Sequence, residues 1–350
     1  MALCLRPFVS LCDFRVAATC RQRLAVRRLP PRRPLATAAS AAADLQPLPP
    51  AAAPKYASLS AEQQRQVDAY LDILLDWNQR MNLTAITDRG EAYERHVNDS
   101  LALLPAIDRC LAEQAQWAAA AHRQPRQRAQ GVQQAAGEDA WERGAGSTAA
   151  QRTAQQQEQQ EQQQASLAAA AAAAEVAAAA AAPPRLIDVG SGAGLPGIIL
   201  AIARPDWEVT LLDSLQKRCK FTEQAIEAAG LANVRVHWGR AEDAGQAPGL
   251  REAHDVAIAR AVAELRVLAE LCLPLVRPGG HWVAAKGAAP AEEVAAAKGA
   301  LGKLGGKLVA VGEVDSESPE GRRTAVIVAK ARPTPAQYPR KPGVPSKKPL

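Results

Sequence analysis

A glycine turn and a later acidic residue are the parts of this sequence best suited to holding a cofactor. The turn Gly190–Gly194 (GSGAG) follows a short apolar run, and Pro196 beyond it suits the first turn of a helix. Glycines there let the backbone approach a ligand closely. Asp213 ends the next apolar run, where a carboxylate can accept hydrogen bonds from ribose hydroxyls. This spacing predicts a site for an adenosine cofactor.

Two classes of cofactor fit this turn. Gly192, Gly194 and Gly197 satisfy the dinucleotide pattern G-x-G-x-x-G of nicotinamide enzymes. Asp188, two residues before the first glycine, is common in class I methyltransferases and favours S-adenosylmethionine. The polar turn 239–243 (GRAED) favours it too, because it follows the third apolar run, where such folds bind adenine. The acids of that turn could instead be a cluster at the N-cap of a helix.

Short apolar runs separated by helical segments must position these residues. The alternation predicts an α/β fold with an open, mainly parallel Rossmann-like sheet, whose ligands bind outside the carboxyl ends of the strands. Two further runs, 307–314 and 324–330, have no helix between them and suit an antiparallel hairpin at the sheet edge. The five strand candidates are 185–190 (RLIDVG), 208–213 (EVTLLD), 234–238 (VRVHW), 255–260 (DVAIAR) and 281–287 (HWVAAKG).

Two amphipathic helices are expected ahead of this sheet. The first begins at a capping box formed by Ser60 and Gln63, and the second follows Asp88. The residues predicted to share an apolar face are Val67, Tyr70, Leu71, Leu74 and Trp77 in the first helix, and Tyr93, His96, Val97, Ser100, Leu101 and Leu104 in the second.

The rest of the chain divides by composition. Residues 112–182 are rich in Ala and Gln without an apolar period, which predicts an insertion between folded units. Its alanine run is only weakly apolar and contains Glu175, so no membrane span is predicted. The expected organisation is a leader (1–55), a helical unit (56–111), the insertion (112–182), the Rossmann-like domain (183–331) and a basic Pro-rich tail (332–350).

The leader carries most of the positive charge of the chain. Residues 1–55 contain nine Lys or Arg and two acids, whereas the net charge of the whole chain is +6. The remainder is therefore close to neutral, and overall charge does not by itself predict a nucleic-acid partner. An Arg- and Ala-rich leader without an apolar core is typical of a chloroplast transit peptide, or alternatively a mitochondrial one. A disordered basic tail that stays attached is the other interpretation.

The cysteines predict a reducing compartment. Three lie in the leader, and Cys110, Cys219 and Cys272 are scattered, so neither a disulfide framework nor a metal site is indicated.

These residues resemble a known family, the bacterial 16S ribosomal RNA guanine-N7 methyltransferases of the glucose-inhibited division protein B type. The resemblance covers residues 60 to about 110 and 185–350, and misses the leader and the insertion. The matching motifs are 77–84 (WNQRMNLT), 95–101 (RHVNDSL), 187–198 (IDVGSGAGLPGI), 211–218 (LLDSLQKR), 259–261 (ARA), 286–287 (KG) and 338–343 (YPRKPG).

The resemblance implies a class I S-adenosylmethionine-dependent methyltransferase domain, preceded by a helical unit, that acts on small-subunit ribosomal RNA in an organelle. It implies cofactor contacts at Gly190, Leu195, Ala241, Glu242 and Arg260. We expect a monomer without membrane association.

Methyl transfer to guanine N7 needs no general base, because N7 has a free lone pair. Catalysis should therefore be mostly positioning. Arg260, which ends the fourth apolar run, is the candidate catalytic residue because it could orient the guanine or the cofactor. A surface salt bridge is the alternative role for this arginine.

Some polar residues have competing roles. His96 lies on the apolar face of a predicted helix and suits structural hydrogen bonding. Asn78 and Asn82 share a predicted helical face and could contact RNA or cap the helix end. The tail could bind RNA phosphates or be merely solvated, with prolines keeping it extended. The cations of the last 21 residues are Lys330, Arg332, Arg340, Lys341, Lys347 and Lys348.

Three other functions fit the sequence less well. A methyltransferase acting on a protein or a small molecule would yield a different methylated product. A nicotinamide-dependent oxidoreductase would need a proton donor that no motif supplies. A catalytically silent ribosome-assembly factor would bind RNA without binding S-adenosylmethionine.

Overall fold

The computed structural model describes residues 52–116, 182–260, 263–287, 290–318 and 321–350, with isolated positions between 160 and 167. These residues belong to one compact unit, Asp44–Leu350. Most of the predicted transit peptide (1–55) and of the predicted insertion (112–182) lies outside the described residues.

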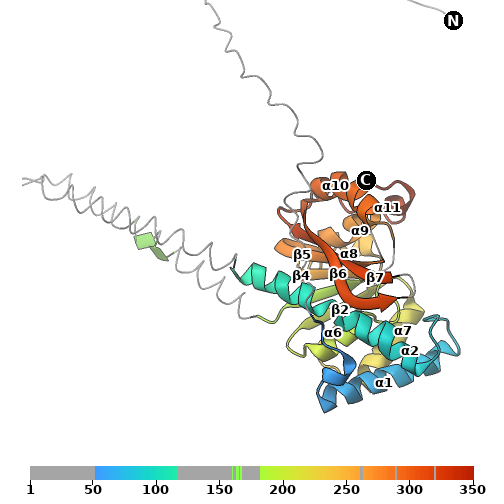
Figure 1. Ribbon diagram of the computed structural model, residues 1–350. Coiled ribbons are helices and arrows are strands. Elements are labelled where there is room, and N and C mark those ends of the chain that lie inside the picture. The colour runs from blue at the N-terminus through green and yellow to red at the C-terminus, as the bar shows by residue number, and fades with distance from the viewer. Residues whose placement is uncertain are drawn as a thin grey trace, which may run out of the picture. The chain divides into compact units, whose positions relative to one another are not determined.

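Seven strands of the described chain form one sheet in the order β3-β2-β1-β4-β5-β7-β6. Figure 1 labels β2, β4, β5, β6 and β7 of this sheet. The first five strands are parallel, and β7 runs antiparallel to both β5 and β6. The predicted parallel strands and edge hairpin are confirmed, although β5 begins five residues earlier than expected. The bounds are β1 (Arg185–Val189), β2 (Glu208–Asp213), β3 (Val234–Trp238), β4 (His254–Arg260), β5 (Val276–Lys286), β6 (Gly306–Ser318) and β7 (Gly321–Lys330).

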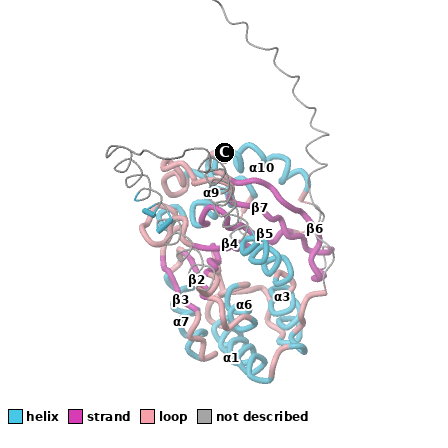
Figure 2. Tube along the Cα trace, turned by 90° about the vertical axis from the view of Figure 1, so that its left-hand side faces the viewer, coloured by secondary structure: helices cyan, strands magenta, loops and turns pink. Residues whose placement is uncertain are grey.

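Helices cover both faces of the sheet, because side chains alternate between two apolar clusters along each central strand. On β1, for example, Leu186 belongs to one cluster and Ile187 to the other. Figure 2 shows α1, α6 and α7 on one side of the strands and α9 and α10 on the other. The helices within the sheet region are α6 (Gly197–Ala203), α7 (Gln216–Ala228), α8 (Ala241–Ala244), α9 (Leu265–Cys272), η4 (Leu273–Leu275) and α10 (Ala291–Leu304).

The N-terminal helices pack on the face that carries α6 and α7, and their apolar residues join the same core cluster. The predicted capping box is confirmed, because Ser60 and Gln63 each accept the backbone N–H of the other. This region contains the short turn η2 (Tyr56–Ser58), α1 (Ala61–Asn78), α2 (Arg89–Ala92), the π-helix η3 (Tyr93–Asn98), α3 (Asp99–Leu101) and a helix over residues 104–116.

The second predicted helix is interrupted rather than continuous. A π-turn adds a residue to the helical repeat, so the α-helical period does not hold through η3. As a result the five consecutive side chains of residues 96–100 are all buried. The predicted face includes His96, Val97 and Ser100, but it misses Asn98 and Asp99.

The C-terminal segment, residues 332–350, ends in the short helix α11 (Val344–Lys347), and α11 contacts α9. The segment therefore lies against the fold instead of extending from it as a tail.

Candidate active site

The glycine turn at the carboxyl end of β1 combines one tightly packed glycine with one open glycine. Gly190, Gly192 and Gly194 have φ values of 75°, 60° and 80°. A Cβ atom on Gly194 would lie 2.4 Å from Cδ1 of Ile198, whereas a Cβ atom on Gly192 would meet only the Gly190 carbonyl oxygen, at 4.0 Å. The backbone at Gly192 is therefore open to a ligand, while Gly194 allows α6 to pack closely.

Asp213 holds the turn in place from the neighbouring strand. Its Oδ2 accepts the N–H of Gly192 at 2.9 Å, and its Oδ1 accepts the N–H of Leu215 at 2.8 Å. Arg218 lies 3.6 Å from Oδ2. Each carboxylate oxygen has a second lone pair, so the side chain can still accept ribose hydroxyls beside the turn.

Asp188 lies beneath the turn with one carboxylate oxygen unpaired. Its Oδ2 accepts the N–H of Gly197 at 2.9 Å, while Oδ1 is buried without a hydrogen-bond partner among the described residues. Burial raises the pKa of this carboxyl to about 7, although the Gly197 N–H and the charge of Arg260 act in the opposite direction. An orphaned buried oxygen at this position fits a cationic ligand group, such as the ammonium of S-adenosylmethionine.

The side chain of Arg260, at the carboxyl end of β4, forms no hydrogen bond or ion pair with any residue that the structure describes. Burial lowers the pKa of its guanidinium, while the charges of Asp188 and Asp99 oppose that shift. The surface salt bridge considered for this residue is not found among the described residues. A largely buried cation with no partner leaves its donors available to a ligand.

The N-terminal helices supply a wall of the site. The hydroxyl of Tyr70 on α1 donates to the carbonyl oxygen of Ala193 in the glycine turn at 2.8 Å. Asp99 accepts a hydrogen bond from Ser316, and its Oδ2 lies 2.7 Å from Nε of Arg323 on β7. Sequence analysis assigned Tyr70 only to an apolar face. The signal it missed was a tyrosine hydroxyl that needs a partner when buried.

His96 has the structural role that its position favours. Its Nε2 lies 2.8 Å from Oγ1 of Thr84 and its Nδ1 lies 3.2 Å from the carbonyl oxygen of Arg95. Burial lowers the pKa of His96 to about 4, so the ring is neutral near pH 7.

Asn78 is the last residue of α1 and holds the loop that follows the helix, whereas the C-cap position is Gln79. Oδ1 of Asn78 accepts the backbone N–H groups of Leu83 and Thr84 at 2.8 and 3.0 Å. The shared helical face with Asn82 is wrong, because α1 ends at Asn78 and Asn82 lies exposed in the following loop.

Exposed apolar side chains lie beside Asp213, and sequence analysis did not single them out. Leu215 follows β2, and Trp238 ends β3 opposite Asp213 in the strand register. Trp238 is 59% exposed, and its Nε1 donates to the carbonyl oxygen of Ser214. A tryptophan that ends an edge strand next to a polar turn was the available signal. The pair offers apolar surface to a purine ring next to the ribose-binding carboxylate.

Glu242 lies in the first turn of α8, at the same edge of the sheet. The acids Glu242 and Asp243 both lie in the first turn of α8, so the alternative of an acidic cluster at a helix N-terminus fits their position, although the N-cap residue itself is Arg240. Oε1 of Glu242 accepts the N–H of Gly343 at 2.8 Å, and Oε2 lies 3.8 Å from Nε of Arg240. Ala241 begins the helix beside it.

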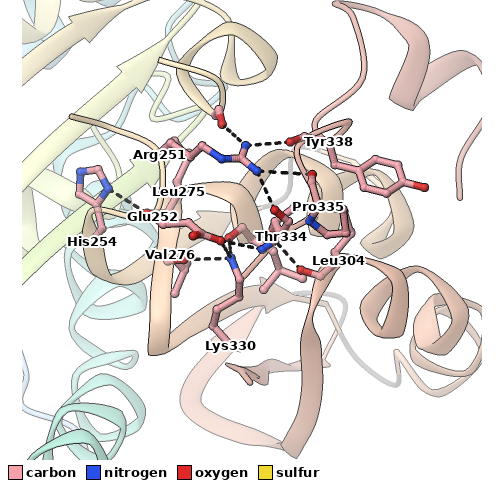
Figure 3. A network of polar contacts seen from close by, with 12 residues as sticks. Arg251, Glu252, His254, Leu275, Val276, Leu304, Lys330, Thr334, Pro335 and Tyr338 are labelled. Carbon is pink, nitrogen blue, oxygen red and sulfur yellow. Dashed lines mark hydrogen bonds and ion pairs between the residues drawn. The ribbon is translucent and has the colours of Figure 1, made fainter. Parts of the chain in front are cut away.

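The expectation of a solvated, extended C-terminus is wrong for two cations of the last 21 residues. Lys330 is buried at the end of β7, where its Nζ lies 3.0 Å from Oε1 of Glu252 and donates to the carbonyl oxygens of Leu273 and Val276 (Figure 3). Burial lowers the pKa of Lys330 to about 8, against the effect of Glu252. Arg340 is paired with the buried Glu270. Lys341, Lys347 and Lys348 are exposed.

This chain has the fold and site of a class I S-adenosylmethionine-dependent methyltransferase. The features that define the class here are the sheet order, the glycine turn and the carboxylates near the carboxyl ends of β1 and β2. Comparison with known sequences gives the family. The sequence model described as GidB, rRNA small subunit methyltransferase G, matches residues 63–114 and 150–321. This chain belongs to that family.

Similar curated proteins carry the name "Ribosomal RNA small subunit methyltransferase G". The protein from Symbiobacterium thermophilum is 39% identical over 286 residues, which cover 80% of this chain and 87% of the relative. The protein from Moorella thermoacetica is 35% identical and covers 84% and 92%.

Solved structures give more distant matches. A 16S rRNA (adenine(1408)-N(1))-methyltransferase mutant from Catenulisporales acidiphilia is 19% identical with a TM-score of 0.36, covering 44% of this chain and 88% of that one. Aeropyrum pernix fibrillarin with bound S-adenosyl-L-methionine is 15% identical with a TM-score of 0.35, covering 42% and 66%.

No helix in the described part of the chain is long and apolar enough to cross a membrane. Its cysteines Cys110, Cys219 and Cys272 are buried and unpaired.

Proposed function

We propose that this methyltransferase modifies N7 of a guanine in the small-subunit ribosomal RNA of an organelle. The observation that carries the proposal is Arg260, a largely buried guanidinium that has no side-chain partner among the described residues and interacts electrostatically with Asp188, whose Oδ1 is also unpaired among them. The bacterial relatives are named as small-subunit ribosomal RNA methyltransferases, which supports the class of substrate.

When bound, S-adenosylmethionine supplies an electrophilic methyl group on a sulfonium centre. We assign its binding to the glycine turn with Leu195, to Asp213 for the ribose, and to Ala241 and Glu242 for the adenine. Asp188, whose Oδ1 has no hydrogen-bond partner among the described residues, would hold the ammonium group.

Arg260 orients the guanine and offsets negative charge near it, because its donors are not used within the described protein. Guanine N7 loses no proton on methylation, so no residue has to act as a base. His96 is neutral near pH 7 and is held by Thr84, and it therefore stays a structural residue in this scheme.

The product identifies the activity. The purified protein, labelled S-adenosylmethionine and unmethylated small ribosomal subunits should yield 7-methylguanine, detected by nuclease digestion and mass spectrometry. Label on an exocyclic amine, a ribose, a protein or a small molecule would contradict the proposal. Cofactor binding without any transfer would favour an assembly factor instead.

The composition of the leader supports the proposed location in an organelle. Residues 1–55 are basic and poor in acids, and the family match begins only at residue 63. We therefore propose import into a chloroplast, with a mitochondrion as the alternative. Fractionation with N-terminal sequencing should find cleavage between about Ala36 and Ser58. An intact Met1 on the imported protein would refute this.

The protein is proposed to act as a monomer. Light scattering coupled to gel filtration measures this directly, and a stable dimer would refute it.

A further inference from the structure

The C-terminal segment is fixed to the fold by side chains from the region of α8 and α9. Arg251 donates to the carbonyl oxygens of Thr334 and Tyr338, at 2.8 Å each (Figure 3). Gln246 donates to the carbonyl oxygens of Ala336 and Pro339, at 3.0 and 3.1 Å. Residues 334–339 therefore follow a defined path along this region.

The next residues of the segment are anchored more strongly. Nη2 of Arg340 lies 2.6 Å from Oε2 of Glu270, and Nε of Arg340 donates to Oε1 at 2.8 Å. The backbone N–H of Arg340 also donates to Oε1 of Glu270, at 2.8 Å. The Glu270 side chain is fully buried, so this charged contact is costly to break.

This anchor brings the backbone of the segment against Gly245, the C-cap residue of α8, the helix that contains Glu242. A Cβ atom on Gly245 would lie 2.7 Å from Cγ of Pro339, which shows how closely the two approach. Three residues beyond Arg340, Gly343 has a φ of 79°, a backbone conformation that other residues rarely adopt. In that conformation its N–H donates to Oε1 of Glu242 at 2.8 Å.

The contact leaves the two oxygens of Glu242 in different states. Oε1 is held by Gly343, whereas Oε2 has only Arg240 near it, at 3.8 Å, among the described residues. A carboxylate accepts hydrogen bonds and cannot donate them. A fixed carboxylate with one free oxygen is therefore suited to a single donor group, such as the 6-amino group of adenine.

We propose that the C-terminal segment is a positioning element of the cofactor site, in which the N–H of Gly343 orients Glu242 so that Oε2 accepts the 6-amino group of adenine. The inference rests on the proposed binding of adenine at Ala241 and Glu242. Without the segment, the Glu242 side chain would rotate freely and lose entropy on binding, so preorganisation by Gly343 favours recognition of the amino group.

Two truncations isolate this contact. Deleting residues 341–350 removes Gly343 but keeps Arg340 and its contact with Glu270. Deleting residues 344–350 keeps Gly343 and serves as the matched control, because both truncations remove the bond from Arg340 to the Lys348 carbonyl oxygen. Thermal unfolding of both proteins establishes that each remains folded.

Calorimetry compares two ligands, S-adenosylhomocysteine and its analogue whose purine lacks the 6-amino group. The full chain and the 344–350 deletion should prefer the amino ligand by about tenfold or more, as expected for a hydrogen bond to a charged acceptor. The 341–350 deletion should lose most of that preference. A segment that only stabilises the fold would weaken both ligands equally and leave the ratio unchanged, which would overturn the inference.

Glu242→Gln tests whether the effect acts through Glu242. In the Gln background, removing residues 341–350 should not change the ratio further, whereas an additional loss of preference would overturn the assignment. A full chain that binds both ligands equally would also overturn it. If the full chain binds neither ligand, the proposed cofactor site itself fails, which is a distinguishable result.

Discussion

Arg340 and Glu270 form an ion pair in which the carboxylate is completely buried and accepts from both the side chain and the backbone of the arginine. The pair joins the C-terminal segment to α9. A stretch of cations and prolines is thereby part of the folded protein.

Replacing Arg340 by alanine should strongly destabilise the protein. The change leaves the Glu270 carboxylate buried without its cation, which costs about 3 kcal/mol in free energy of unfolding. Urea denaturation measures the loss. Arg322→Ala is the matched control, because Arg322 and Glu313 form an exposed pair on the β6–β7 hairpin and should contribute far less. Equal losses in the two variants would contradict a buried role for the pair.

Asp213→Ala should weaken S-adenosylmethionine binding by about tenfold or more. The substitution removes the proposed ribose acceptor and also releases the N–H groups of Gly192 and Leu215, so some stability is lost as well. Calorimetry at a temperature where the variant is folded separates the two effects. Asp243→Ala, at an exposed position of α8, should leave affinity unchanged. Unchanged affinity in Asp213→Ala would show that the pocket is misassigned.

Cofactor affinity should rise with pH between about 5.5 and 7, on the order of tenfold, because Asp188 has a pKa of about 7 and its ionised form binds the ammonium group. His96, with a pKa of about 4, stays neutral through this range. Affinity measured in this window should become independent of pH in Asp188→Asn. A rise of equal size in that variant would assign the titration to another group.

The Asp188 carboxyl affects the stability of the protein in the direction opposite to its effect on cofactor affinity. Since folding raises its pKa from 3.8 to about 7, its stabilising contribution is present below pH 3.8 and is lost as the pH rises through 7. Chemical denaturation of the ligand-free protein and of Asp188→Asn, compared across this range, tests the sign.

Arg260→Gln should lower kcat by about a hundredfold, because an oriented cationic donor is lost at the reacting base. The unfolding midpoint should stay the same or rise, since the arginine is a largely buried charge without a protein partner in the described structure. Arg277→Gln provides the contrast. Arg277 pairs with Asp255 and Gln114, so its loss should reduce stability and leave kcat unchanged. Normal turnover by Arg260→Gln would remove Arg260 from the mechanism.

Local pattern was enough to predict the central fold and the glycine turn. Alternating apolar runs with helical segments between them specify parallel strands, because a parallel sheet must be covered on both faces. The positive φ angles of the turn require glycine at Gly190, Gly192 and Gly194, so the sequence itself marks the site. Asp188, the penultimate residue of β1, and Asp213, the last residue of β2, were placed correctly because the carboxyl ends of the two parallel strands lie at the same edge of the sheet.

The sequence by itself determined the sheet, the turn at the end of β1 and the family of the chain. Tertiary structure alone decided which charged groups are buried and what they bind. From the sequence alone, Arg340 was expected to be a solvated cation. In the structure it is the partner of Glu270, an acid that is buried within the mostly apolar stretch 265–276. Gly343 meets Glu242 across 101 residues, and no local period encodes that contact. The physical reason is that burial and pairing depend on which distant segments pack together, whereas periodicity reports only which face of an element is apolar.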